Sequence, residues 1–557
     1  MRVTKAPYNF IPFSDQVICR YSRAEDLPGH DTLDPKLLSG EIHLTLTADT
    51  PVCVGGDKKN RSDRGARPAK AADGSYQIPG STLRGLIREN MQILSLGLVR
   101  PGVDFENIRM YYRDFASGRD AVSSDLRRYY RGVAQNAKGG YLCRTGKYTL
   151  CIRPVFGQVL RLRRSDPLAA PWKEYYAFQN QVWFKADGET VTEIYGERRP
   201  GCRPGVLMSP GRMQRQNSLY LFPEEDRKAP PIPISEEEEL SYLDDFKRKY
   251  TTLKGDRSFW NLPKVGEKKA VFYIRRDGFT SFGVSKYLRI GYKYPLSHGL
   301  PQSYREVQEP FLDYPNSILG FAGKTGCYRS RVQVGDLKAK GDPVPMEPVT
   351  IILASPKPTV QAAYVAGGGN YNRDNFQLGG YKQYWLKDPV LTGAEIRSNV
   401  GTQMQPLPRG TQFSGVIRYR NLHPDELGLL LWCLRLDEGC FQSVGMGKPY
   451  GYGRVKVSID SLQEWQPGKL YASLTAGPAV LGNTEDRVEE LICAYDRYAC
   501  LQTGEETTLR DRDAIQDFLY MKKTVRRDTD QVSYMGLNEH RNLEVPLPAV
   551  KEIRRDG

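Results

Sequence analysis

The segment SVGMGKPYGYG, residues 443–453, places one lysine among closely spaced glycines and is called the glycine loop below. Its glycines are Gly445, Gly447, Gly451 and Gly453. Glycine adopts positive φ at low cost, and its missing Cβ lets another group approach the backbone closely. The pattern therefore suggests a loop that contacts phosphate through Lys448 and bare backbone. The alternative is a tight hairpin with no ligand.

Several enzyme classes do not fit the motifs of this chain. A P-loop requires Ser or Thr after Gly-Lys, and here Pro449 follows Lys448. The loop also follows an expected helix and precedes an expected strand, which is the reverse of P-loop and dinucleotide-binding motifs. The ten cysteines form no C-x-x-C pair and the five histidines do not cluster, so no metal site is predicted.

A second candidate for phosphate binding precedes the loop by over 350 residues. Residues 40–56 alternate in hydrophobicity as a strand does, and 78–96 carry apolar residues at helical spacing. The connection, residues 57–77, is polar and basic, with Lys58, Lys59 and Arg61. Gly80 and Ser81 begin the predicted helix, with Ser81 as its N-cap. Arg84 and Arg88 share a face near this N-terminus, which suits an anion; an ordinary capped surface helix is the alternative.

The elements around these motifs predict an α+β fold. Residues 409–422 read as a strand, 423–436 as a helix and 454–459 as a strand, and further strand candidates cover 328–334 and 347–355. Two such units give a βαββαβ order, which predicts a ferredoxin-like, RRM-type core with helices on one face. This core takes residues 1–100 and 311–470.

The remaining chain is assigned to an insertion and an extension. Residues 101–310 form a large insertion that combines tyrosine doublets with basic clusters, a composition that can contact RNA or a partner protein. Its segment 222–240 reads as a proline-rich linker. Residues 471–557 read as a C-terminal helical extension.

Charge favours a polyanionic partner. The chain has 80 Lys and Arg against 65 Asp and Glu, a formal charge of +15. Such a surplus favours nucleic acid, although a solvated basic surface gives the same count. No apolar run is long enough to cross a membrane and no signal peptide is evident, so a cytoplasmic protein without membrane contact is expected.

Taken in order, the motifs resemble those of the RAMP superfamily of CRISPR-associated proteins. The matching segments are IPGSTLRGLIR (78–88), SILGFAGKTGCYRSRVQVGDL (317–337) and GMGKPYGYG (445–453). The second departs from the family pattern, with Leu319-Gly320 for Phe-Gly and Gly335-Asp336 for Ser-Asp. APYNFIPF (6–13), TADTPVCVGG (47–56) and ASPKPTVQAAYV (354–365) are similar to large members found with type III systems.

The resemblance implies an RNA-binding subunit of a type III RNA-guided effector complex. Its partners would be a guide (CRISPR) RNA, a target RNA and other effector subunits, and binding would require no cofactor. The residues expected to contact RNA are Lys58, Lys59, Arg61, Gly80, Ser81, Arg84, Arg88, Lys324, Gly445, Gly447, Lys448, Gly451 and Gly453.

Two catalytic alternatives stay open. Family members that cut target RNA use an aspartate in the loop corresponding to 57–77, with a divalent metal such as Mg²⁺. Asp63 and Asp57 are the candidates here, while Ala66 lies near the family position. The other alternative is a guide-processing endoribonuclease, which would need an acid or base such as His43 near the RNA. No helix-turn-helix motif supports DNA binding.

Overall fold

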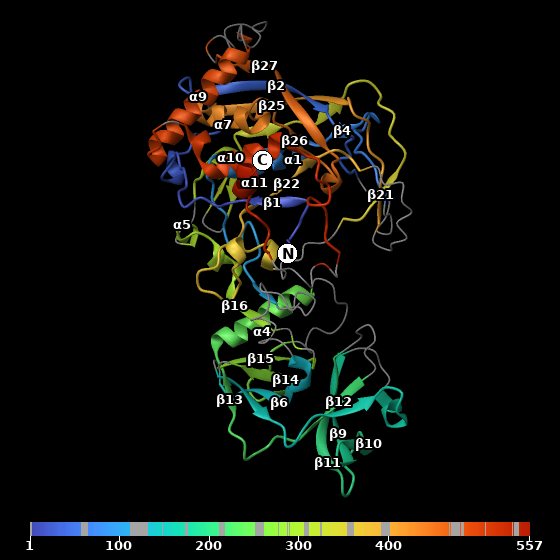
Figure 1. Ribbon diagram of the computed structural model, residues 1–557. Helices are drawn as coiled ribbons and strands as arrows, with labels where there is room; N and C mark the ends of the chain where they lie inside the picture. The colour runs from blue at the N-terminus through green and yellow to red at the C-terminus, as the bar shows by residue number, and fades with distance from the viewer. Residues whose placement is uncertain are drawn as a thin grey trace. The chain divides into compact units, whose positions relative to one another are not determined.

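The computed structural model divides the chain into two units. It describes residues 3–56, 65–111, 132–146, 149–172, 177–210, 218–250, 261–276, 278–286, 288, 290–305, 311–323, 326–353, 361–390, 401–466, 468, 479–480, 484–506, 508–536, 539 and 545–556. Unit 1 comprises residues 1–107 and 296–557, and unit 2 comprises residues 108–295. Both units contain helices and antiparallel sheets, so the fold is α+β (Figure 1).

The main sheet of unit 1 is built from strands far apart in sequence. Its central order is β27 (Arg454–Glu464), β2 (Leu38–Ala48), β25 (Gln412–Leu422) and β20 (Leu337–Ala339), with every pairing antiparallel. β19 (Val332–Val334) also pairs with β25. The register sets Leu44 opposite Ile459 and Gly415, so the buried residues of β2 fall on one face. The strand at 347–355 was placed wrongly, because β21 (Val349–Ile351) pairs with β24 (Thr402–Met404) in a separate sheet.

Several of the described helices share the core on the apolar face of this sheet. α1 (Gly80–Leu94) and α7 (Pro424–Arg435) follow β2 and β25 and pack with their buried side chains, including Leu44, Leu83 and Leu430, in one core. α9 (Thr484–Thr503) and α10 (Asp513–Lys523) share that core, and α9 lies along α7 beside β27 (Figure 1). α11 (Val550–Asp556) packs on α10. Residues after 483 therefore complete the core of unit 1.

A buried ion pair fixes α7 to the strand that precedes it. Arg331 and Glu426 pair with fully buried side chains, and Arg331 also donates to the carbonyl oxygens of Ser317 and Asn421. Glu426 additionally accepts from the His423 amide at 2.9 Å, which caps α7. These contacts couple α6 (Tyr314–Leu319), β25 and α7. Removing either partner would leave an uncompensated buried charge.

The second face of the main sheet is polar. β2 presents Glu41, His43 and Thr45 there, while Arg418 on β25 pairs with Glu41 at 2.8 Å. Thr45 donates to Asp460 of β27 at 2.6 Å. Positive and negative groups alternate across this face, and its described strands offer no exposed aromatic ring beyond the imidazole of His43. Base stacking on this face is therefore not built into the described strands.

Unit 2 contains two five-stranded antiparallel sheets. One has the order β10 (Thr190–Tyr195), β9 (Ala177–Asp187), β11 (Arg203–Pro210), β12 (Ser218–Pro223) and β8 (Leu160–Arg163). The other has the order β13 (Ile232–Ile234), β7 (Leu150–Pro154), β6 (Lys138–Arg144), β14 (Lys268–Arg276) and β15 (Phe279–Gly283). Side chains of both sheets, such as Phe222 and Phe272, share a core.

The linker expected at 222–240 is not present. Its residues contribute the end of β12, strand β13 and the first turn of α4 (Glu236–Tyr250). The proline-rich sequence misled the prediction because Pro233 occupies β13, an edge strand of its sheet, where a missing amide donor is tolerated.

Candidate nucleic-acid interface

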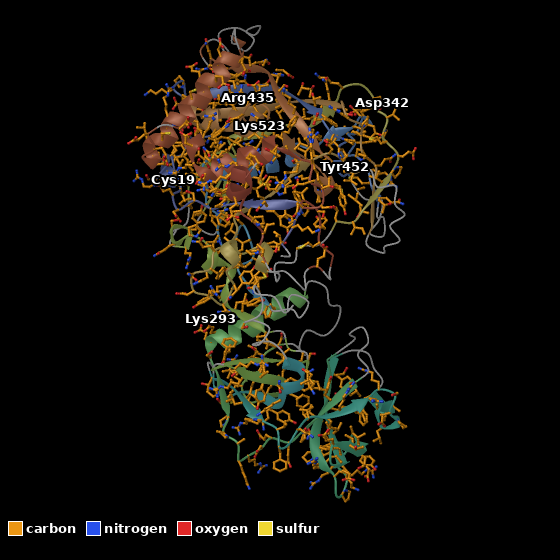
Figure 2. All side chains as sticks on the ribbon, in the orientation of Figure 1. Cys19, Lys293, Asp342, Arg435, Tyr452 and Lys523 are labelled. Carbon is orange, nitrogen blue, oxygen red and sulfur yellow. The ribbon has the colours of Figure 1, made fainter. Side chains whose placement is uncertain are left out.

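The glycine loop is a hairpin connection between β26 (Gln442–Ser443) and β27. Ser443 pairs with Arg454, and the Val444 amide donates to the Gly453 carbonyl at 2.8 Å. Its four glycines all have positive φ, between +75° and +86°. A 3-10 turn, η8 (Lys448–Tyr450), carries Lys448 at the tip. The side chains drawn in Figure 2 include Tyr452 of this loop.

The glycines let the loop lie directly against the protein's own backbone. A Cβ at Gly445 would lie 2.3 Å from the Cys53 carbonyl oxygen, and one at Gly453 would lie 1.9 Å from that of Val444. The Met446 amide donates to Cys53 O at 2.9 Å, and the Gly453 amide donates to Pro51 O at 2.9 Å. A Cβ at either position would therefore clash with the protein's own backbone, so internal packing alone explains why these residues are glycine.

The segment held by the glycine loop is the start of the other motif. Residues 51–55 end the first predicted strand and lead into the basic loop 57–77. Gly56 donates to Arg67 O at 2.9 Å, and Ala69 donates to Val54 O at 2.8 Å, so residues 67–69 of the basic loop return to this segment. The two sequence-distant turns thus lie side by side at residues 51–55.

Lys448 belongs to a buried group of charges. It is half-buried, and burial lowers the pKa of its ammonium, an effect that Glu89 of α1 partly offsets. Lys522 of α10 is 3% exposed, and burial lowers its pKa to about 8. Glu89 attracts and Lys448 repels the Lys522 charge. Gln383 of β22 (Tyr381–Tyr384) donates to Glu89 at 2.8 Å.

This group was only partly foreseen from the sequence. Lys448 was a candidate, but Lys522 and Glu89 were not, because their proximity depends on how α10 and α1 pack. The signal available in the sequence was a lysine at helical spacing from the apolar Ile515 and Phe518 of α10. Glu89 already supplies a negative charge beside both lysines and Lys522 is buried, so within this group it is the half-buried Lys448 that can contact an anion.

The N-terminus of α1 has an internal partner. Pro79 is the N-cap, so the prediction of Ser81 as N-cap is wrong; Ser81 is exposed within the first turn. The Gly80 amide donates to Asp336 Oδ1 at 2.7 Å. A Cβ at Gly80 would lie 2.3 Å from Val334 O, which explains the glycine. A carboxylate of the chain therefore already satisfies one of the free amides.

Arg84 and Arg88 turn toward α6 rather than toward the glycine loop. Arg84 donates to Leu319 O at 2.5 Å. Arg88 donates to Asn316 Oδ1 at 3.4 Å and lies 3.8 Å from Asp104. Of the charged side chains on α1, it is Glu89 that interacts with Lys448. The structure therefore does not bring the two arginines together with Lys448, although each guanidinium keeps further donors.

The remaining predicted residues lie in or near segments that are not described. Asp57, Lys58, Lys59, Arg61, Asp63 and Lys324 all fall outside the described residues. Ala66 is described, is buried, and pairs with Met404 in β3 (Gly65–Ala66), so a carboxylate is absent at that position. Asp73 lies 2.6 Å from Lys338, and this contact lowers its pKa.

No group of three or more potential metal ligands occurs among the described residues. His43 lies on the polar sheet face with its Nε2 3.3 Å from Glu41 Oε2. The described helices include none that could cross a bilayer.

Neither the scan against protein-family models nor the search of curated proteins finds a match for this chain.

Proposed function

We propose that this protein is an RNA-binding subunit of a type III CRISPR RNA-guided effector complex, with guide RNA, target RNA and other effector subunits as partners. The observation that carries the proposal is the contact between the glycine loop and residues 51–55. It joins two of the six segments on which the resemblance to the RAMP superfamily rests, 47–56 and 445–453.

The strand order supports a ferredoxin-like core. In chain order the elements are β2, α1, β19 with β20, β25, α7 and β27, and the sheet order is β27, β2, β25 and β20. A ferredoxin-like fold has this βαββαβ sequence and places its first and third strands at the centre. Both helices lie on the apolar face, which agrees with that proposal.

The proposed RNA contact uses the edge loops rather than the open sheet face. That face has paired charges and lacks exposed aromatic rings in its described strands. The glycine loop instead offers Lys448 at its tip, while its glycine backbone packs against residues 51–55. Backbone and lysine contacts bind phosphate without reading base sequence, which a guide of any sequence requires.

Sequencing the nucleic acid that accompanies the protein from its native host tests this function. We expect short RNAs of uniform length that share a 5′ tag. Purified protein and its associated subunits without any RNA would contradict the proposal.

The two catalytic alternatives have separate tests. If the complex cuts target RNA with Mg²⁺, Asp63→Ala and Asp57→Ala should each be compared with the wild type, because cutting that survives both changes excludes these carboxylates. Incubating the isolated protein with a repeat-containing transcript tests guide processing.

A further inference from the structure

The positive charge of this protein is distributed unevenly between its units. Unit 2 contains 35 Lys and Arg against 21 Asp and Glu, whereas unit 1 contains 45 against 44. Unit 2 therefore supplies almost the entire surplus of +15. A surplus of this density favours a polyanion near unit 2 rather than only near the proposed core site.

The sheet containing β9 and β10 curls around its own core. Alternate residues, including Val182, Phe184 and Leu219, are fully buried in that core. β8 and β10 stand at opposite ends of the strand order and yet contact each other. The residues between the buried ones lie on the outer side of the sheet. Met208, Tyr220 and Phe222 on that side pack in the core shared with the other sheet, so only part of the outer side reaches solvent.

An aromatic row lies on the outer side of this curled sheet. Trp183 on β9 pairs in register with Tyr195 on β10 on one side and with Pro204 on β11 on the other. Trp183 is half-buried and Tyr195 is 36% exposed. The register places these rings as neighbours on one surface, where each keeps part of its area in solvent.

Basic side chains border this row. The Arg199 guanidinium lies 5.4 Å from the centroid of the Tyr195 ring. Lys185, one outward position beyond Trp183, keeps 43% of its side chain exposed while pairing with Glu193 at 3.0 Å. On β8, which contacts β10, Arg161 and Arg163 alternate with buried leucines and are exposed. Arg161 donates to the neutral Ser218 Oγ at 2.7 Å, and no carboxylate is bonded to it among the described residues.

We propose that this aromatic–basic face, formed by Trp183, Tyr195, Lys185, Arg199, Arg161 and Arg163, binds single-stranded nucleic acid. Exposed rings stack on unpaired bases, and neighbouring cations pair with phosphates, so the combination fits a single strand. A duplex hides its base faces, and the carboxylate side chains of an acidic protein offer no planar ring for the aromatic row. The site lies in unit 2 and does not depend on the function proposed for the core.

The test measures binding of the full chain to a fluorescein-labelled 20-nucleotide oligouridine by anisotropy over a range of salt. The first variant is Trp183→Ala combined with Tyr195→Ala, and its matched control is Phe156→Ala, which removes another exposed ring of unit 2, 58% exposed. The second is Arg199→Glu, and its control is Lys138→Glu, an exposed lysine on the other sheet. Thermal unfolding of each variant checks that unit 2 remains folded.

We expect the aromatic double variant to lose about tenfold or more in affinity, because it removes both rings on which bases would stack. Arg199→Glu should weaken binding and reduce the salt slope by about one. Both controls should bind like the wild type. If the variants lose affinity for an oligothymidine in the same pattern, that result would also support a general single-strand site.

Two results would overturn the inference. One is an aromatic double variant that stays folded and binds like the Phe156→Ala control. The other is a duplex RNA or polyglutamate that competes as well as the oligouridine, which would mean that charge alone acts. If the native protein carries no guide RNA but the losses occur as expected, the proposed core function fails and this face stands.

Discussion

Unit 1 and unit 2 use their charged residues in different ways. In unit 1, Arg331, Glu426, Lys522 and Lys387 are almost fully buried, and its basic and acidic residues nearly balance. In unit 2, Arg161, Arg163 and Arg199 face solvent with no carboxylate bonded to them among the described residues. The first arrangement stabilises packing, whereas the second creates a field that attracts anions. Net charge alone therefore does not locate a binding site within a chain.

The largest effect is expected from the buried pair of unit 1. Arg331→Met should lower the free energy of unfolding of unit 1 by about 3–5 kcal/mol, because Glu426 would remain buried and unpaired. Urea unfolding, with unit 1 followed through amide exchange in α7, provides the measurement.

The matched change in unit 2 is Lys185→Met, which breaks the exposed pair with Glu193 and should cost less than about 1 kcal/mol. The double variant Arg331→Met with Glu426→Leu should recover part of the loss. Equal costs for Arg331→Met and Lys185→Met would erase the contrast between the units.

Lys522 and Lys387 predict a pH dependence of stability. Burial lowers the pKa of each to about 8, from 10.5 for an ordinary lysine. Between these values each of the two lysines binds more protons in the unfolded chain than in the folded one, so their contribution to stability should rise as pH increases from about 8 to 10.5. Buried thiols such as Cys53 and Cys440, whose pKa burial raises to about 11, contribute with the opposite sign.

Lys522→Met should remove up to about 3 kcal/mol of this rise, and unfolding curves at several pH values measure it. Lys138→Met, an exposed control in unit 2, should leave the rise unchanged. If the free energy of unfolding of Lys522→Met changes with pH as steeply as that of the wild type, burial does not lower the pKa of Lys522.

Gly453→Ala tests the internal role of the glycine loop. The new Cβ would lie 1.9 Å from Val444 O at a φ of +78°, so we expect destabilisation by about 1–3 kcal/mol. Gly85→Ala is the control, because Gly85 lies within α1 with nothing within 4 Å of a new Cβ. Gly85→Ala should stabilise the protein by about 0.5–1 kcal/mol, and thermal unfolding of both variants measures the difference. If Gly453→Ala does not change the stability, the close contact between Gly453 and Val444 does not require glycine.

The smallest effect is expected from the arginines of α1. Arg84→Ala with Arg88→Ala should change oligouridine affinity less than Arg161→Ala with Arg163→Ala, because the former pair contacts α6. The salt slope should fall mainly in the β8 variant. The reverse ranking would return the principal RNA contact to α1.

Local patterns predicted the main elements of unit 1. The helix expected at 78–96 spans Gly80–Leu94, and the one at 423–436 spans Pro424–Arg435, since both carry strong apolar periodicity. The strand β21 was assigned to the wrong sheet. Alternation of apolar and polar residues in 347–355 identifies a strand, but it does not identify the strand with which it pairs. The hydrogen bond between the Gly80 amide and Asp336 could not be predicted, because the two residues are 256 positions apart and no local sequence pattern links them.

The site was less predictable than the fold for a similar reason. The glycine loop was identifiable because glycine spacing is a local property. Lys522 approaches Lys448 only through packing of α10, and Trp183 meets Tyr195 only through strand register. The charge difference between the units could have been counted once the boundaries near 107 and 295 were known.

Ultraviolet crosslinking of the full protein to single-stranded RNA, with crosslinked peptides identified by mass spectrometry, tests most directly how the two units divide RNA binding. Crosslinks at Trp183 or Tyr195 in unit 2, together with crosslinks in the glycine loop of unit 1, are the predicted result. Crosslinks confined to the open face of the β2–β25 sheet, or none in unit 2, would contradict this account.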